Sequence, residues 1–319
     1  MACALNAMGG NEIRNISDIS ILILLLLLVG CTRQKPSQQT KLPELVQPEK
    51  LGIVVSIIPQ AYFVKRITDD LVDITVLVGQ GQNHETYEPT PKQMEEVSTA
   101  RVYFTIGLPF ERVLVPKIEE TYSQVEMPEM DIVDTSEDVP LRNIEAHIEE
   151  KGAKSETGEK DPHIWTSPRL VKIQAATIEK EMENIDPVHK DVYQANLASF
   201  ISDLDTLDIF IKDKLKNLTN RKFLIIHPSW GYFADDYDLK QIPVELQGKE
   251  PGAKELEEFV QFARKENLRN IFLEQQASSK SAESIAEQIG GKVIRIDPLA
   301  YDYIQNLRNV ADIFSEVLQ

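Results

Sequence analysis

The chain has 319 residues and a formal net charge of −17, with 51 acidic side chains against 34 Lys and Arg. This balance argues against nucleic acid or an anionic membrane surface as the main ligand, because both repel an acidic protein. A hydrophobic content of 42% is ordinary for a globular protein, and the length allows two domains. The two cysteines, Cys3 and Cys31, lie in the N-terminal region, so metal chemistry elsewhere must use histidine and carboxylate.

The N-terminal segment, residues 1–30, has the pattern of a lipoprotein signal peptide. Its uninterrupted apolar run, residues 21–29, is about half of the roughly 20 residues that a membrane span needs. The sequence L-V-G-C at residues 28–31 resembles the bacterial lipobox, in which the cysteine is lipidated and becomes the new N-terminus. The stretch before the run is not basic, unlike that of most signal peptides, and Met8 is an alternative start. We expect a lipid on Cys31 and attachment to the extracytoplasmic face of a bacterial membrane, in the periplasm or at the cell surface.

The next segment, residues 31–50, is polar and interrupted by proline, which predicts a flexible tether. From residue 51 onward, short apolar runs alternate with helical stretches. Because the apolar runs are continuous, we expect a parallel sheet covered on both faces, in an N-terminal α/β lobe over residues 51–166. The expected elements of this lobe are strands at 51–57, 74–78 and 102–106 and helices at 59–69 and 91–100.

Two acidic segments complete the first lobe. Residues 118–141 contain many acidic side chains but no Lys or Arg, and residues 144–160 form a charged loop that includes His147. Runs of charge are usually solvated. We therefore interpret both segments as exposed surface.

A helical stretch links the first lobe to a second one. Ser167 is a suitable N-cap and Pro168 suits a first helical turn, and an Asp-Pro pair at 186–187 then separates two helices. We assign residues 167–217 to these linking helices and residues 218–319 to a C-terminal α/β lobe. The expected elements of the second lobe are strands at 222–226, 270–273 and 292–296 and helices at 252–266, 281–289 and 303–318. The predicted fold is thus α/β, with two βα-sandwich lobes joined by a long, rigid backbone helix.

Four polar side chains are candidate ligands, and three of them lie where a ligand of this fold would bind, while His163 lies at the domain junction. His84 follows the predicted strand that ends at residue 78, His227 and Asp297 directly follow later strands, and His163 stands before the linking helices. Ligands of open α/β sheets gather at the carboxyl ends of strands. Spacing alone does not join these residues, and each histidine taken singly is better explained as a structural residue.

Four sequence segments around these residues connect them. The segments are N-H-E-T-Y-E-P-T-P from residue 83, D-P-H-I-W-T-S-P from 161, H-P-S-W-G-Y-F-A-D-D-Y from 227 and R-I-D-P-L from 295. In this order they resemble the zinc and manganese solute-binding proteins of ABC importers, the cluster 9 family, and in particular its zinc-uptake receptors. The resemblance extends from residue 51 to the C-terminus. It implies that the metal lies in a cleft between the two lobes.

Carried over position by position, the resemblance implies four metal ligands: His84, His163, His227 and Asp297. Three imidazoles and one carboxylate can close a tetrahedral shell around Zn²⁺ without a thiolate. Manganese-preferring relatives tend to have glutamate where this chain has His227, so the expected cargo is Zn²⁺, with Mn²⁺ as the alternative. Glu274, which ends a predicted strand, is expected to orient a histidine, and direct ligation is its alternative role.

Two further expectations concern protons and the acidic loop. Histidine protonates near pH 6.5, so zinc affinity should fall steeply as the pH drops through that range. In zinc-specific relatives a histidine-rich loop is thought to collect metal loosely at the place of residues 144–160. The single histidine here, His147, does not favour that role.

The expected function is an extracytoplasmic receptor that captures Zn²⁺, or a similar divalent cation, for an ABC importer. Its partners would be a transmembrane permease with a separate cytoplasmic ATPase, and we expect a lipid-anchored monomer that binds no nucleic acid. We expect no enzyme, because Walker A and G-x-S-x-G motifs are absent and the H-E-x-x motif at His84 ends in Glu88 instead of histidine. The alternatives are a zinc-dependent hydrolase, the same receptor specialised for Mn²⁺ or Fe²⁺, and a surface adhesin.

Overall fold

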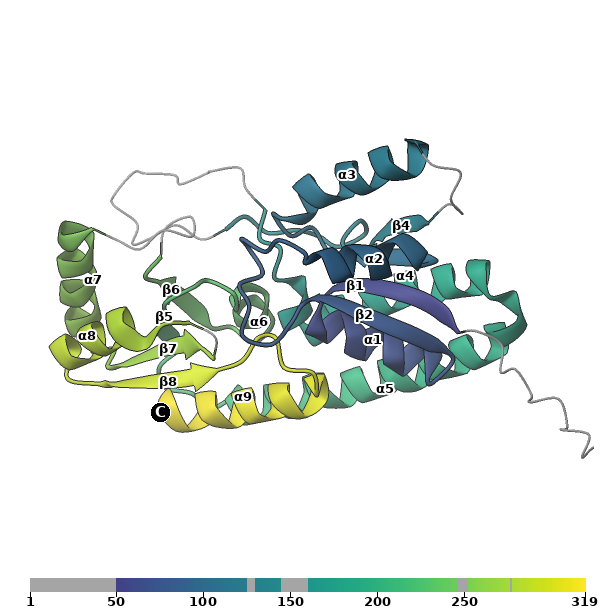
Figure 1. Ribbon diagram of the computed structural model, residues 1–319. Helices are drawn as coiled ribbons and strands as arrows, with labels where there is room; N and C mark the ends of the chain where they lie inside the picture. The colour runs from purple at the N-terminus through teal and green to yellow at the C-terminus, as the bar shows by residue number, and fades with distance from the viewer. Residues whose placement is uncertain (1–49, 125–129, 145–159, 246–251, 276) are drawn as a thin grey trace, which may run out of the picture. The chain divides into compact units, whose positions relative to one another are not determined.

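The computed structural model describes residues 50–124, 130–144, 160–245, 252–275 and 277–319 (Figure 1). The predicted signal peptide, nearly all of the predicted tether, Cys31 and His147 lie outside these residues. No helix in the described ranges combines the length and the apolar character needed to cross a membrane. Residues 49–319 form one compact unit, and both sheets found among the described residues lie in it.

The first sheet consists of four parallel strands in the order β2-β1-β3-β4. Its two central strands are buried along nearly their whole length, which explains their continuous apolar sequence. The strands are β1 (Leu51–Ile57), β2 (Val72–Val78), β3 (Val102–Thr105) and β4 (Asp131–Asp134), and the connecting helices are α1 (Ile58–Thr68), α2 (Pro91–Thr99) and α3 (Glu111–Gln124).

The second sheet repeats this topology, with four parallel strands in the order β6-β5-β7-β8. Its strands are β5 (Lys222–Ile225), β6 (Lys240–Pro243), β7 (Asn270–Glu274) and β8 (Lys292–Ile296), and its helices are α6 (Gly231–Asp236), α7 (Ala253–Lys265) and α8 (Ser279–Ile289). In each sheet the first and third strands are neighbours, and the connections that follow these two strands lead to opposite edges of the sheet. Ligands of such sheets bind at this point, beyond the carboxyl ends of the strands.

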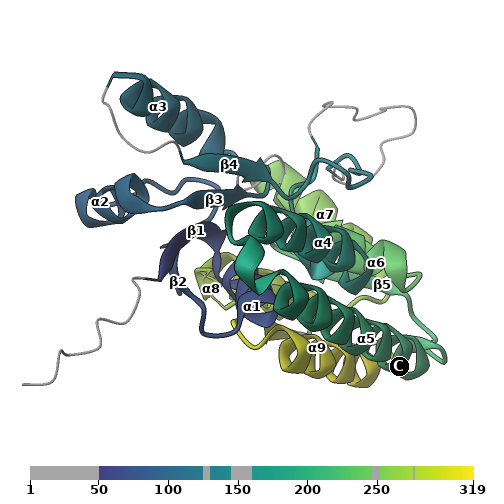
Figure 2. The same cartoon turned by 90° about the vertical axis from the view of Figure 1, so that its right-hand side faces the viewer.

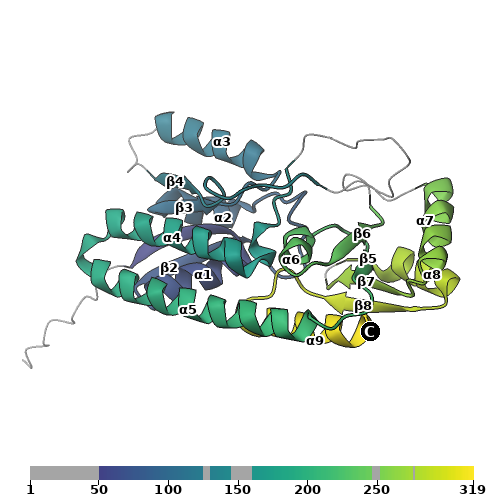
Figure 3. The same cartoon turned by 180° about the vertical axis from the view of Figure 1, so that it is seen from behind.

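Two antiparallel helices connect the sheets, α4 (Pro168–Ile185) and the 26-residue α5 (Lys190–Leu215). The Ser167 side chain accepts a hydrogen bond from the Leu170 amide at 3.2 Å, so the predicted cap of α4 is confirmed. Short 3-10 turns, η1 (Ile164–Thr166) and η2 (Pro187–His189), precede the two helices. Figures 2 and 3 show α5 running from one sheet to the other, with the last helix, α9 (Tyr303–Val317), packed along it.

The hydrophobic core is continuous between the sheets. Phe314 of α9 stacks on Phe272 of β7, with ring centroids 4.7 Å apart. At the other end of α9, Tyr303 packs edge-on against Phe63 of α1 at 5.1 Å, and Phe63 also contacts Phe200 of α5. Side chains of both sheets thus share one core cluster, and a second, smaller cluster lies within the C-terminal sheet. The α/β fold with two sheets and a long helix is confirmed, whereas the lobe boundaries at 51–166, 167–217 and 218–319 stay a prediction.

The interpretation of residues 118–141 as solvated surface is wrong. Ile118, Met130 and Val139 are buried, and β4 within this segment pairs with β3. The sequence analysis also missed α3, α6 and β6. These elements are short or carry many charged side chains, so their apolar positions are too few to form a visible pattern.

A buried carboxylate closes the loop after β3. Glu111, in the first turn of α3, accepts hydrogen bonds from the amides of Ile106, Gly107 and Leu108 at 2.7 to 3.2 Å and from the hydroxyl of Ser56. Gly107 has φ +90, a conformation that side chains other than glycine rarely adopt. Burial raises the pKa of Glu111 to about 7, while these hydrogen bonds act in the opposite direction.

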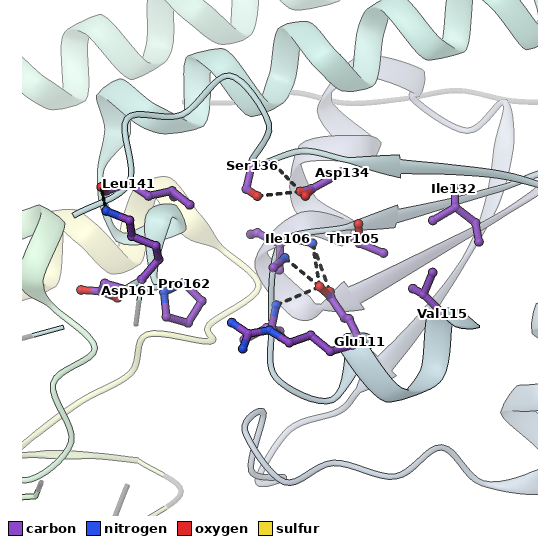
Figure 4. A pocket seen from close by; sticks show the side chains of 14 residues that line it. Thr105, Ile106, Glu111, Val115, Ile132, Asp134, Ser136, Leu141, Asp161 and Pro162 are labelled. Carbon is purple, nitrogen blue, oxygen red and sulfur yellow. Dashed lines mark hydrogen bonds between the residues drawn. The ribbon is translucent and has the colours of Figure 1, made fainter. Parts of the chain in front are cut away.

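The same loop borders a cavity of about 490 Å³ (Figure 4). One wall contains Glu111 and the end of β3, and the opposite wall contains Asp161 and Pro162. Glu111 therefore holds one wall of a cavity whose opposite wall directly precedes His163 in the sequence.

Replacing Glu111 with alanine should lower the free energy of unfolding by about 2–4 kcal/mol, because three amides lose their buried acceptor. Urea denaturation at pH 6, below the raised pKa of Glu111, would measure this change, because the contribution of the buried carboxyl group falls as the pH rises through that pKa. As a control, Arg112→Ala alters the exposed neighbouring residue and should change stability by less than about 0.5 kcal/mol. Equal stability of Glu111→Ala and wild type would show that the carboxylate does not hold the loop.

Candidate metal site

Three histidines come together from three separate segments. His84 lies in the loop between β2 and α2, His163 directly precedes η1, and His227 follows β5. His227 thus stands at the carboxyl end of the first strand of its sheet, next to β7, where the connections diverge. The prediction that these three residues meet is confirmed by their geometry.

The imidazole nitrogens of the three side chains converge. Nε2 of His163 lies 3.0 Å from Nε2 of His84 and 3.2 Å from Nε2 of His227, and one ligand atom from each residue lies within 4.8 Å of the others. Two nitrogens bound to Zn²⁺ at about 2.0–2.1 Å in tetrahedral geometry are about 3.3 Å apart. His84, His163 and His227 are 3, 2 and 8% exposed, respectively. The spacing and the burial suit a single Zn²⁺ ion.

Two carboxylates hold the opposite ring nitrogens of two of these histidines. Asp161 Oδ1 lies 2.7 Å from Nδ1 of His163, and Glu245 Oε2 lies 3.0 Å from Nδ1 of His227. A carboxylate at Nδ1 keeps the proton there, so that the lone pair of Nε2 points toward the metal position. Arg142 forms an ion pair with Asp161 at 3.5 Å. Sequence reasoning missed both carboxylates, although Asp161 begins the D-P-H-I-W-T-S-P segment.

The pKa values of His84 and His227 are shifted in opposite directions. Burial lowers the pKa of His84 well below its usual value, and the neighbouring His163 and His227 lower it further. For His227, burial is the largest influence and also lowers the pKa, but the hydrogen bond to Glu245 and the charges of Glu274, Glu85 and Glu245 outweigh it and raise the pKa to about 9. His227 is therefore protonated at neutral pH until a metal displaces its proton.

The remaining predicted site residues lie around the triad. Asp297 follows β8 as expected, and its Oδ1 accepts a hydrogen bond from the amide of Leu299 at 2.9 Å. The metal-ligating group found among the described residues contains the three histidines without Asp297, so its role as fourth ligand stays a prediction. Glu274 ends β7, is 7% exposed and acts on His227 through its charge. Its role as an orienting partner or as a ligand likewise stays a prediction.

One aromatic side chain, Trp165, borders the site. The Trp165 ring lies 5.1 Å from that of His163 and 5.7 Å from that of His84, and its Nε1 donates to the carbonyl of Pro298 at 2.8 Å. This bond ties the His163 segment to the loop of Asp297.

A third acidic side chain at the site, Glu85, was not predicted either. Glu85 Oε1 lies 3.6 Å from Nε2 of His227, the nitrogen that faces the metal position. In the sequence, Glu85 only marked the beginning of an incomplete H-E-x-x-H motif, so nothing distinguished it.

Comparison with known proteins places this site in a family. Residues 53–317 match the family model described as zinc-uptake complex component A, periplasmic (ZnuA). The chain is similar to the high-affinity zinc uptake system protein ZnuA of Bacillus subtilis, at 29% identity over 86% of this chain and 84% of that protein. It is 26% identical to the zinc-binding lipoprotein AdcA of Streptococcus pneumoniae over 90% of this chain, which spans about half (55%) of that relative's length.

A solved structure supports the same assignment. A ZnuA deletion mutant with zinc bound superposes with a TM-score of 0.77 at 40% identity, covering 85% of this chain and 99% of the other. The family match extends over most of the chain and includes all three histidines. The chain therefore belongs to the family of periplasmic zinc-uptake components, the solute-binding receptors of metal ABC transporters.

Proposed function

We propose that this protein is the extracytoplasmic receptor that binds Zn²⁺ through His84, His163 and His227 and delivers it to an ABC importer. The observation that supports this function is the convergence of three buried Nε2 atoms at separations that fit zinc. The zinc-uptake family description and the zinc-bound similar structure agree with it. The transmembrane permease and the separate ATPase are partners that family membership implies.

Asp297 is the residue that we propose as fourth ligand. It follows β8 in the same sheet that presents His227, and the Trp165 hydrogen bond joins its loop to the His163 segment. A carboxylate added to three imidazoles balances part of the charge of Zn²⁺ and closes a tetrahedral shell. With four protein ligands the shell has no open position for a catalytic water, in keeping with a receptor instead of a hydrolase.

Zinc is the proposed cargo, because imidazole-rich shells favour it over the harder Mn²⁺. A role in adhesion is not proposed. Two solved structures whose descriptions mention adhesion are 25% and 24% identical to this chain, and this likeness does not carry the adhesive role over to it.

The first prediction concerns the triad. His227→Ala should weaken zinc binding by at least about 100-fold, because it removes a ligand and leaves Glu245 without its imidazole partner. Competition titration against a chelator of known affinity would measure the loss. His189→Ala is the matched control, since His189 pairs with Asp186 in the turn before α5. Wild-type affinity in His227→Ala would refute the ligand assignment.

The second prediction concerns pH. Because the pKa of His227 is about 9 and that of His84 is well below 6.5, zinc binding at pH 8 should release about one proton, from His227. The apparent affinity should therefore rise about tenfold per pH unit up to pH 9 and then level off. Calorimetry in two buffers of different ionisation enthalpy counts the released protons.

Glu245→Gln provides the internal test of this pH dependence. Without the Glu245 charge the pKa of His227 should fall, so less than one proton should be released at pH 8. Equal proton release in the variant and the wild type would contradict the proposed role of Glu245.

The third prediction concerns the membrane. We propose that Cys31 is the mature N-terminus and carries several acyl chains, because a single chain anchors only marginally. Mass spectrometry of the membrane fraction should detect diacylglyceryl-Cys31, and Cys31→Ala should abolish this modification. A mature chain that still begins at Met1 or Met8 would be incompatible with the proposal.

A further inference from the structure

Glu85 approaches a different histidine nitrogen from the one that Asp161 and Glu245 approach. Its Oε1 lies 3.6 Å from Nε2 of His227, and this Nε2 is 3.2 Å from Nε2 of His163. The carboxylate oxygen therefore reaches the side of the imidazoles on which a metal would sit. Asp161 and Glu245 approach the Nδ1 atoms, on the far side of their rings.

Glu85 also marks the boundary between the site and the solvent. Its side chain is 27% exposed, whereas the three histidines are almost fully buried. The loop holds it in this place: the amide of Glu85 donates to Oδ1 of Asn83 at 2.7 Å, and the adjacent residue is His84. A cation that enters from this side meets the Glu85 carboxylate before it meets the buried nitrogens.

Imidazole nitrogen and carboxylate oxygen prefer different metals. Imidazole suits Zn²⁺, which is satisfied by four ligands, whereas Mn²⁺ prefers carboxylate oxygen and six ligands. A carboxylate that can approach the three nitrogens thus contributes little to a complete tetrahedral zinc shell. It contributes more to the shell of a larger, harder cation.

We propose that Glu85 is an additional oxygen ligand on the solvent side of the triad, and that it determines how well this site accepts Mn²⁺ relative to Zn²⁺. This inference rests on the proposed function, because it assumes that the three histidines bind the cation.

The test compares Glu85→Gln with Glu88→Gln, which removes the same charge from an exposed position of the same loop. Affinities for Zn²⁺ and Mn²⁺ are measured by competition titration, with each metal added alone to purified, metal-free protein. We expect Glu85→Gln to weaken Mn²⁺ binding by about tenfold or more and Zn²⁺ binding by a smaller factor, so that the preference for zinc increases. Glu88→Gln should change both affinities equally and slightly.

Measurements at high salt concentration distinguish direct ligation of the metal by Glu85 from long-range electrostatic attraction. At about 1 M salt the Debye length is about 3 Å, so a distant charge is screened while a bound oxygen is not. The selective loss of Mn²⁺ affinity in Glu85→Gln should persist at this salt concentration.

Two results would overturn the inference: a loss that disappears at high salt, or affinities in Glu85→Gln equal to those in Glu88→Gln. Failure of the proposed function would look different. The wild-type protein would then bind no zinc, or the His227→Ala variant would bind zinc with the wild-type affinity.

Discussion

The mutual approach of three buried imidazole nitrogens is the constraint on which the rest of this structure depends. His84 and His163 are 79 residues apart in the sequence and His163 and His227 are 64 apart, yet their Nε2 atoms lie 3.0 and 3.2 Å from each other. Two sheets of the same topology supply loops at the carboxyl ends of their strands, and the linking helices bring these loops together. The cation is thus bound by side chains that depend on the whole fold for their proximity.

Charge around the triad is arranged so that the site is stable before a cation arrives and attractive to one. Burial favours the neutral imidazole of His84 and opposes the protonation of His227. The glutamates around His227 reverse this effect at one position and hold a proton there near neutral pH. A divalent cation replaces that proton and adds to the local positive charge, so the same glutamates that favour the protonated imidazole also favour the metal.

Strands with long, continuous apolar sequences were predictable from the sequence, and short strands with charged or proline residues were not. β1 and β8 begin and end at the predicted residues, because each is a continuous run bounded by turn signals. β4 and β6 have only four residues each and include charged or proline side chains, so no periodicity identified them. Glu245 was missed for the same reason, since it follows the unpredicted β6 and its pairing with His227 depends on that strand. The histidines themselves were joined by resemblance to a family, because spacings of this length contain no information about contact.

The hydrophobic core that the two sheets share limits the ways in which the site can select a metal. Separating the sheets would pull Phe63 from Phe200 and Tyr303, and Phe272 from Phe314, and each buried aromatic side chain exposed in this way costs about 1.5–3 kcal/mol. Large movements of the two sheets are therefore costly, and α5 and α9 oppose them along their length. The loops of His84 and Asp297 lie outside the helices and strands that form this core. Metal preference must then arise mainly from the donor atoms on these loops, so a single carboxylate beside His84 can matter more than the angle between the sheets.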